Sequence, residues 1–207
     1  MTIRHHLGAP SLMSYAAGSL PSALAAVAAA HLAMCRACRR DLALFERIGG
    51  AMLEALTPVP LANSKPALPH GTPQQTALEH DSTVANPILA CARDDFAGVS
   101  WRRIGIGLWH RPLPLSGQGT LQLIKAAPGA SVPDHGHAGA ELTLVLRGAL
   151  IDATGRYGPG DVADLDEEVE HAPLADASLG CICAVANERP TRFHSLLARL
   201  LQPWHGL

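Results

Sequence analysis

The chain has 207 residues, 48% of them hydrophobic and 16% charged, which is typical of a folded globular protein and not of a disordered one. Residues 1–56 carry five arginines against three acidic side chains, and residues 57–207 carry eleven basic against fifteen acidic ones, giving a formal net charge of -2. Neither part is basic enough for a nucleic-acid-binding surface, so we expect no direct contact with DNA or RNA.

The cysteine content favours a reducing compartment. The chain has five cysteines, an odd number, and Cys35 and Cys38 are too close in sequence for the disulfide framework of a secreted protein. The longest apolar run, over residues 23–35, is too short and too rich in alanine to cross a bilayer, and arginines follow it directly. We therefore expect a cytoplasmic protein without a membrane segment or a targeting segment.

The N-terminal residues predict a small helical bundle. Ser11 is placed to cap a short helix that ends at Gly18. A longer helix is expected from residue 19, because apolar side chains then recur every three or four positions until Gly49 and Gly50, and residues 51–56 extend the helical pattern weakly. A turn between two helices at Cys35 is the alternative to one continuous helix.

A possible metal site lies within this helical run. His31, Cys35 and Cys38 are spaced H-x3-C-x2-C, and on a continuous helix they would share one face. A closed zinc site takes four nitrogen or sulfur ligands, so a fourth donor is needed, and His5 and His6 are the nearest. The alternative is a core histidine beside two inert buried thiols. The spacing favours the metal.

The middle and the C-terminal half of the chain differ from this bundle in their sequence pattern. Five prolines within residues 57–73 disfavour helix and predict a linker, followed by weak helical patterns at 74–80 and 88–92. From residue 101 on, short runs rich in Val, Ile, Leu and Trp alternate with Gly and Pro, which predicts an all-β sandwich or small barrel. A last helix is expected over residues 192–201.

A second group of metal-ligand side chains occurs in the β half. His135 and His137 are two residues apart and would point to one face of a strand. Glu141 lies four residues later and would point to the same face after an intervening turn. Glu141 opens an apolar run, and a carboxylate leading into a core strand needs a partner, which a divalent cation supplies. The alternative is a surface turn that happens to hold these side chains.

Two further cysteines in the β half lie on one expected strand. Cys181 and Cys183 alternate in the run CICAV and so point to one face. They could report oxidation if they were exposed, but burial in the barrel is the favoured interpretation.

The β half resembles the cupin superfamily. Residues 129–148 match its first motif, G-x5-H-x-H-x3-E-x6-G, at every defined position. The second motif normally places a histidine just after P-x-G, whereas Asp161 follows Gly160 here, so His171 is the expected substitute as fourth ligand. The resemblance implies a β-barrel of the double-stranded β-helix, or jelly-roll, type.

The whole chain resembles the ChrR-type zinc anti-sigma factors. The segments MTIRHH, YAAG, HLAMCRAC, VPDHGH, ELTLVLRG, EHAP and CICA follow that pattern. The resemblance implies an α+β protein of two domains, with a helical zinc-binding domain at 1–56 and a cupin domain with a C-terminal helix at 96–207, joined by a linker with weak helix at 57–95. It implies two Zn²⁺ per chain, one held by His6, His31, Cys35 and Cys38, the other by His135, His137, Glu141 and His171.

The same resemblance implies a function. Family members sequester a group IV (extracytoplasmic-function) RNA polymerase sigma factor as a heterodimer and release it on oxidative stress such as singlet oxygen. The apolar helix flanks are the expected contact, with ordinary core packing as the open alternative: Leu12, Tyr15, Leu20, Leu42 and Phe45. The family carries a fourth helix after the third, where this chain has its proline-rich linker.

Two other classes of function fit the sequence less well than a regulator does. A metal-dependent cupin dioxygenase or isomerase would not need an additional H-x3-C-x2-C helical bundle, so we expect no enzyme activity. A metal-dependent DNA-binding repressor would need a basic recognition helix, and none is visible in the sequence.

Overall fold

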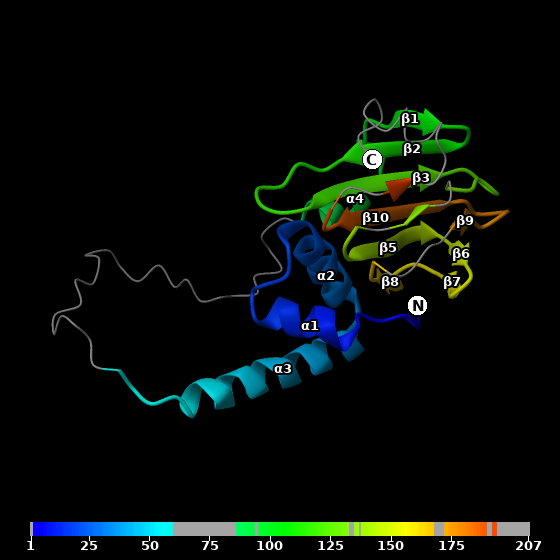
Figure 1. Ribbon diagram of the computed structural model, residues 1–207. Coiled ribbons are helices and arrows are strands. Elements are labelled where there is room, and N and C mark those ends of the chain that lie inside the picture. Colours follow the sequence, from blue (N-terminus) through cyan, green and yellow to red (C-terminus); the bar gives the residue numbers. More distant parts are fainter. Residues whose placement is uncertain are drawn as a thin grey trace.

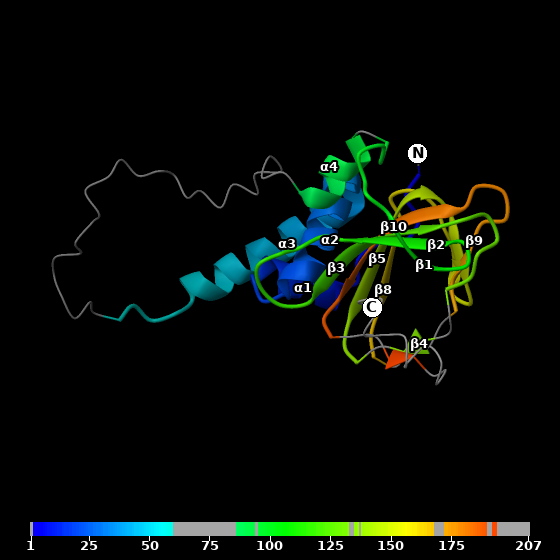
Figure 2. The ribbon, with the colours of Figure 1, turned by 90° about the horizontal axis from the view of Figure 1, so that it is seen from above.

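A helical layer packs on one side of an antiparallel β-barrel (Figure 1). The computed structural model describes residues 2–59, 86–93, 95–132, 135–136, 138–167, 172–189 and 192–193. Seen from above, the helices lie to one side of the strands, and the outer half of α3 projects away from the barrel (Figure 2). The predicted α+β fold class is confirmed.

The described residues form the helices α1 (Ala9–Ala16), α2 (Ser22–Met34), α3 (Arg36–Glu54) and α4 (Pro87–Arg93). The continuous helix expected after residue 19 is in fact two helices, because Cys35 is extended, with φ -102° and ψ 109°. The alternative of a turn at the cysteines is therefore the right one.

One predicted helix cap is wrong. Ser11 does not cap α1, because Gly8 is the N-cap and Pro10 stands in the first turn, where its fixed φ suits a helix start. Helix α3 runs through Gly49 and Gly50 to Glu54, as the weak helical pattern after these glycines indicated. Glycine only weakens a helix, by about 1 kcal/mol per residue relative to alanine, so two glycines do not force an end.

Helix α4 lies where the sequence indicated a weak helical pattern, and it packs against α2. The Asn86 Nδ2 donates to the Ala26 carbonyl (2.8 Å), and Ile88 is fully buried. The helical layer thus includes a fourth helix, which follows the proline-rich segment in the sequence.

Eleven strands are described, and every pairing between them is antiparallel. The main sheet has the order β1-β2-β3-β10-β5-β8, a second sheet has β7-β6-β9, and β11 pairs with β4. The strands are β1 Arg102–Gly105, β2 Leu108–Pro112, β3 Thr120–Ala126, β4 His135–Gly136, β5 Glu141–Gly148, β6 Leu150–Asp152, β7 Gly155–Tyr157, β8 Val162–Leu165, β9 Leu174–Ala175, β10 Cys181–Asn187 and β11 Arg192–Phe193.

The helix expected from residue 192 is wrong at its start. Arg192 and Phe193 form strand β11, because they pair with Gly136 and His135 of β4. The rest of the expected helix lies outside the described residues.

The central strand β10 shows how the core is divided. Ile182, Ala184 and Ala186 face a cluster shared with the helices, whereas Cys183 and Val185 face a second cluster inside the barrel. Helix α2 is rich in alanine, and these small side chains let it lie close against the sheet. The helices therefore share a core with the outer face of the barrel sheet, and the predicted domain boundaries stay a prediction.

Candidate metal centre

The structure brings together the four side chains of the N-terminal ligand set. His6 comes from the segment before α1, His31 from the last turn of α2, Cys35 from the junction of α2 and α3, and Cys38 from the start of α3. One ligand atom of each lies within 4.8 Å of all the others. His31 and both cysteines are buried, and His6 is exposed at the edge of the group.

The spacing of these atoms fits a tetrahedral zinc site. His31 Nε2 lies 3.2 Å from Cys38 Sγ, and His6 Nδ1 lies 3.3 Å from Cys35 Sγ and 3.6 Å from Cys38 Sγ. Tetrahedral Zn–N and Zn–S bonds place neighbouring ligand atoms about 3.3–3.8 Å apart. The donors are therefore already close to the geometry that the ion requires.

His5 is not part of this group. Its ring packs against the Tyr157 ring at a centroid distance of 4.1 Å, and its Nδ1 lies 3.5 Å from the Asp161 Oδ2. The structure thus places His6, and not its neighbour, beside the cysteines, where the sequence alone left both histidines open.

Burial sets the protonation of the metal-free group. Desolvation lowers the pKa of His31, which keeps its ring neutral and able to act as a ligand. Desolvation also raises the pKa of the Cys38 thiol to about 12, so this thiol holds its proton until a cation displaces it. Metal binding at this group should therefore release a proton and weaken as the pH falls.

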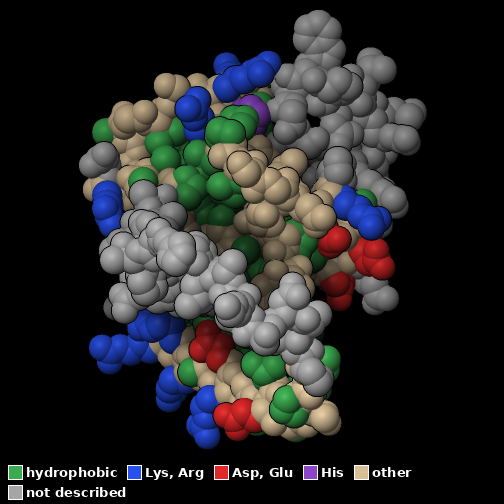
Figure 3. All heavy atoms as spheres, turned by 90° about the vertical axis from the view of Figure 1, so that its left-hand side faces the viewer, with side chains coloured by type: hydrophobic (Ala, Val, Ile, Leu, Met, Phe, Trp, Pro, Cys, Tyr) green, Lys and Arg blue, Asp and Glu red, His purple; other side chains and the backbone are tan. Residues whose placement is uncertain are grey.

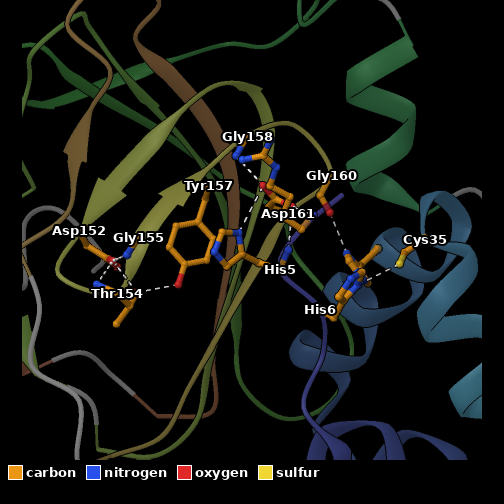
Figure 4. A network of polar contacts seen from close by, with 12 residues as sticks. His5, His6, Cys35, Asp152, Thr154, Gly155, Tyr157, Gly158, Gly160 and Asp161 are labelled. Carbon is orange, nitrogen blue, oxygen red and sulfur yellow. Dashed lines mark hydrogen bonds and ion pairs between the residues drawn. The ribbon is translucent and has the colours of Figure 1, made fainter. Parts of the chain in front are cut away.

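The ring of His31 is also held from its other side, by the barrel turn whose Gly160 is labelled in Figure 4. Its Nδ1 lies 2.9 Å from the carbonyl oxygen of Gly160, in the turn between β7 and β8 of the barrel. Because Nε2 faces Cys38, Nδ1 carries the ring proton and donates to this carbonyl. Cys35 Sγ in turn accepts from the Cys38 N–H at 3.5 Å and so caps α3.

The second predicted ligand set is described only in part. Glu141 opens β5 with 3% of its surface exposed, and Thr143 Oγ1 donates to its Oε1 at 3.0 Å. Burial raises the pKa of Glu141 to about 7. His135 lies in β4, and His137 and His171 lie outside the described residues. A metal in the barrel therefore stays a prediction.

The barrel cysteines are buried, as the favoured interpretation held. Cys181 and Cys183 are free thiols on the inner face of β10. The neighbouring Cys181, burial and the charge of Glu141 hold the pKa of Cys183 well above its ordinary value. This thiol is consequently not an activated nucleophile in the described structure.

The barrel also contains a buried polar pair that no sequence motif indicated. His110 of β2 faces the same side of its strand as Leu108, and its Nδ1 lies 3.0 Å from Gln122 Oε1. Its Nε2 is buried without a hydrogen-bond partner among the described residues. A lone histidine in an apolar strand gave no reason to single it out.

The residues expected to contact a partner are largely covered. Leu12 and Leu42 are buried, and Tyr15, Leu20 and Phe45 pack half-buried against the same core. Several exposed apolar side chains lie instead further along α3, on its outer half.

These side chains are Leu44, Ile48 and Met52, which are 52%, 47% and 67% exposed and spaced four residues apart. Ile48 and Met52 lie three and seven residues after Phe45, so they continue its stripe along the part of α3 that projects away from the barrel.

The comparisons with known proteins agree with this geometry. Residues 92–190 match the family model of the ChrR cupin-like domain. Over 217 aligned residues the chain is 39% identical to the anti-sigma-E factor ChrR of Cereibacter sphaeroides, and the match covers 99% of each chain. The chain belongs to the ChrR family of anti-sigma factors.

A solved structure of a ChrR protein is also similar. The crystal structure of Rhodobacter sphaeroides SigE in complex with the anti-sigma ChrR contains a chain that is 38% identical, with a TM-score of 0.72. The match covers 90% of this chain and 99% of that one. KdgF from Halomonas sp. matches 44% of this chain and 87% of its own, at 19% identity and a TM-score of 0.40, which is too low to support an argument.

The ChrR-type resemblance read from the sequence is thereby confirmed. Within the part of the chain that the structure describes, no helix is both long and apolar enough to cross a membrane.

Proposed function

We propose that this chain is an anti-sigma factor that sequesters a group IV (extracytoplasmic-function) sigma factor and releases it under oxidative stress such as singlet oxygen. The observation that carries the proposal is the 39% identity with the anti-sigma-E factor ChrR along 99% of both chains. The structural match to a ChrR chain in complex with SigE supports a heterodimer with the sigma factor. The free thiols suit the reducing cytoplasm.

The proposed metal of the N-terminal centre is zinc, held by His6, His31, Cys35 and Cys38. Four protein ligands leave no open position, so the ion would be structural and contribute folding free energy to the junction of the helices. For the same reason the centre supports a regulator and not an enzyme. A second zinc is proposed in the barrel at His135, His137, Glu141 and His171.

The proposed contact surface for the sigma factor is the exposed stripe of α3. Leu44, Ile48 and Met52 form an apolar line along a helix whose first half is rich in charged side chains, a pattern that suits a helix lying in a groove of its partner. Figure 3 shows hydrophobic side chains among arginine and acidic ones at the lower end of the molecule, where α3 lies. The edge of this contact surface could include the half-buried side chains of Tyr15, Leu20 and Phe45.

A pull-down tests the proposed function. The full chain should retain a co-expressed group IV sigma factor, and Cys35→Ser with Cys38→Ser should lose it, because the ligands that join α2 to α3 are gone. Cys91→Ser is the matched control, since Cys91 lies in α4 away from the metal group, and it should bind normally. Retention of the sigma factor by the double variant would contradict the proposal.

A further inference from the structure

The turn of the barrel at residues 158–161, between β7 and β8, touches the metal centre although it is distant in sequence. Its Gly160 carbonyl accepts from the buried ring of His31, 129 positions earlier in the chain. Gly160 has a φ of +89°, which a residue with a side chain rarely adopts, so the glycine allows the turn to present this carbonyl.

The next residue of the turn holds the segment that carries the other histidine ligand. One carboxylate oxygen of the buried Asp161 accepts from the main-chain N–H groups of Arg4 (2.6 Å) and His5 (3.0 Å). The other accepts from the N–H of Gly158 (2.8 Å), which closes the turn itself. His6 follows directly after the two anchored residues.

A second aspartate anchors the chain on the other side of His6. Asp164 of β8 accepts from the Gly8 N–H at 2.8 Å and from the Ser11 hydroxyl at 3.0 Å. His6 therefore sits on a non-helical segment whose main chain is tied to the barrel both before and after it. Without these bonds, metal binding and the packing of Leu7 would have to order most of this segment.

The turn is joined to the strand that starts with Glu141. The Gly160 N–H donates to the Val145 carbonyl (2.8 Å), and the Val145 N–H donates to the Asp161 carbonyl (3.0 Å). Strand β8 continues from the turn and pairs with β5 as far as Glu141 opposite Leu165. One short segment thus contacts the metal centre on one side and β5 on the other.

We propose that Asp161 is a positioning residue of the N-terminal metal centre, and that the 158–161 turn links zinc affinity to the docking of the helices on the barrel. Outer contacts of this kind orient metal ligands, and their loss usually lowers metal affinity about 10–100-fold. Because such coupling is reciprocal, bound metal also strengthens the docking. The proposal rests on the proposed zinc centre and names a route by which the barrel acts on it.

Cobalt titration of the full chain tests this role. The charge-transfer absorption of thiolate bound to Co²⁺ reports a site with cysteine ligands, and displacement by Zn²⁺ against a chelator gives the zinc affinity. Asp161→Ala should lower that affinity about 10–100-fold. Asp161→Asn keeps one acceptor oxygen and should fall between this variant and the unaltered chain.

Asp176→Ala is the matched control. The Asp176 carboxylate also accepts main-chain N–H bonds, from Ser178 and Leu179, and pairs with Arg156, but all these partners lie within the barrel. Its zinc affinity should stay within about twofold of the unaltered chain, well below the expected loss at Asp161. An unchanged affinity in Asp161→Ala, or an equal loss in both variants, would overturn the proposal.

The cobalt titration and the sigma-binding assay test different claims. Binding of a sigma factor is measured on the unaltered chain, with no reference to Asp161. Failure there would refute the anti-sigma role, whereas the cobalt titration would still decide whether Asp161 positions the metal ligands.

Discussion

The helical centre brings four metal-ligand side chains together, whereas Glu141 is the one predicted barrel ligand whose side chain the structure describes. The helical centre joins the N-terminal segment, α2 and α3 near their ends, and its four donor atoms lie within 4.8 Å of one another. Glu141, in contrast, lies within a sheet that has an apolar cluster of its own around Val145 and Leu150. We infer that metal stabilises local structure mainly in the helices, while the barrel folds without it.

The largest effect should follow from removing the metal. In the full chain treated with a chelator, hydrogen exchange at the start of α1 and of α3 should speed up at least about 100-fold, because the ligands no longer hold these ends together. The amides of β3, β5 and β10 should keep their protection. Equal loss of protection in helices and sheet would contradict the difference between the two regions.

A smaller effect is expected from the exposed stripe of α3. Ile48→Asp places a charge in the proposed interface and should weaken sigma binding about 10–100-fold, while the zinc content stays unchanged. Leu179→Asp is the control, because Leu179 is 64% exposed in a barrel turn away from the helices. Isothermal titration with the sigma factor measures both variants, and equal affinities for the two would remove α3 from the interface.

A third prediction concerns the barrel without metal. The pKa of Glu141 is raised to about 7 in the folded chain, so the unfolded chain loses its proton first as the pH rises. The free energy of unfolding should therefore fall between about pH 4 and pH 8, by at most about 3 kcal/mol. Urea denaturation of the metal-free chain measures this slope, and Glu141→Gln should reduce it. An identical slope in the unaltered chain and in Glu141→Gln would contradict the assignment of this pH dependence to Glu141.

The sequence predicted local features well because they depend on spacing alone. His31, Cys35 and Cys38 were found from H-x3-C-x2-C, and the structure places them together. The break at Cys35 was not decided, because a continuous helix and a turn fit the same spacing. It follows from the extended backbone of Cys35, whose sulfur caps the next helix.

Features that depend on distant contacts were beyond the sequence pattern. The placement of His6 instead of His5 depends on hydrogen bonds between the N-terminal segment and Asp161, more than 150 residues away. Likewise, Arg192 and Phe193 have helical spacing with their neighbours but pair with β4. In both cases a tertiary contact outweighs the local preference.

Transcription by RNA polymerase with a group IV sigma factor tests the central claim most directly. An equimolar amount of the zinc-loaded chain should abolish transcription from a promoter of that sigma factor, and removal of the metal should restore it. Transcription that continues unchanged in the presence of the zinc-loaded chain, with every group IV sigma factor of the same organism, would contradict the account.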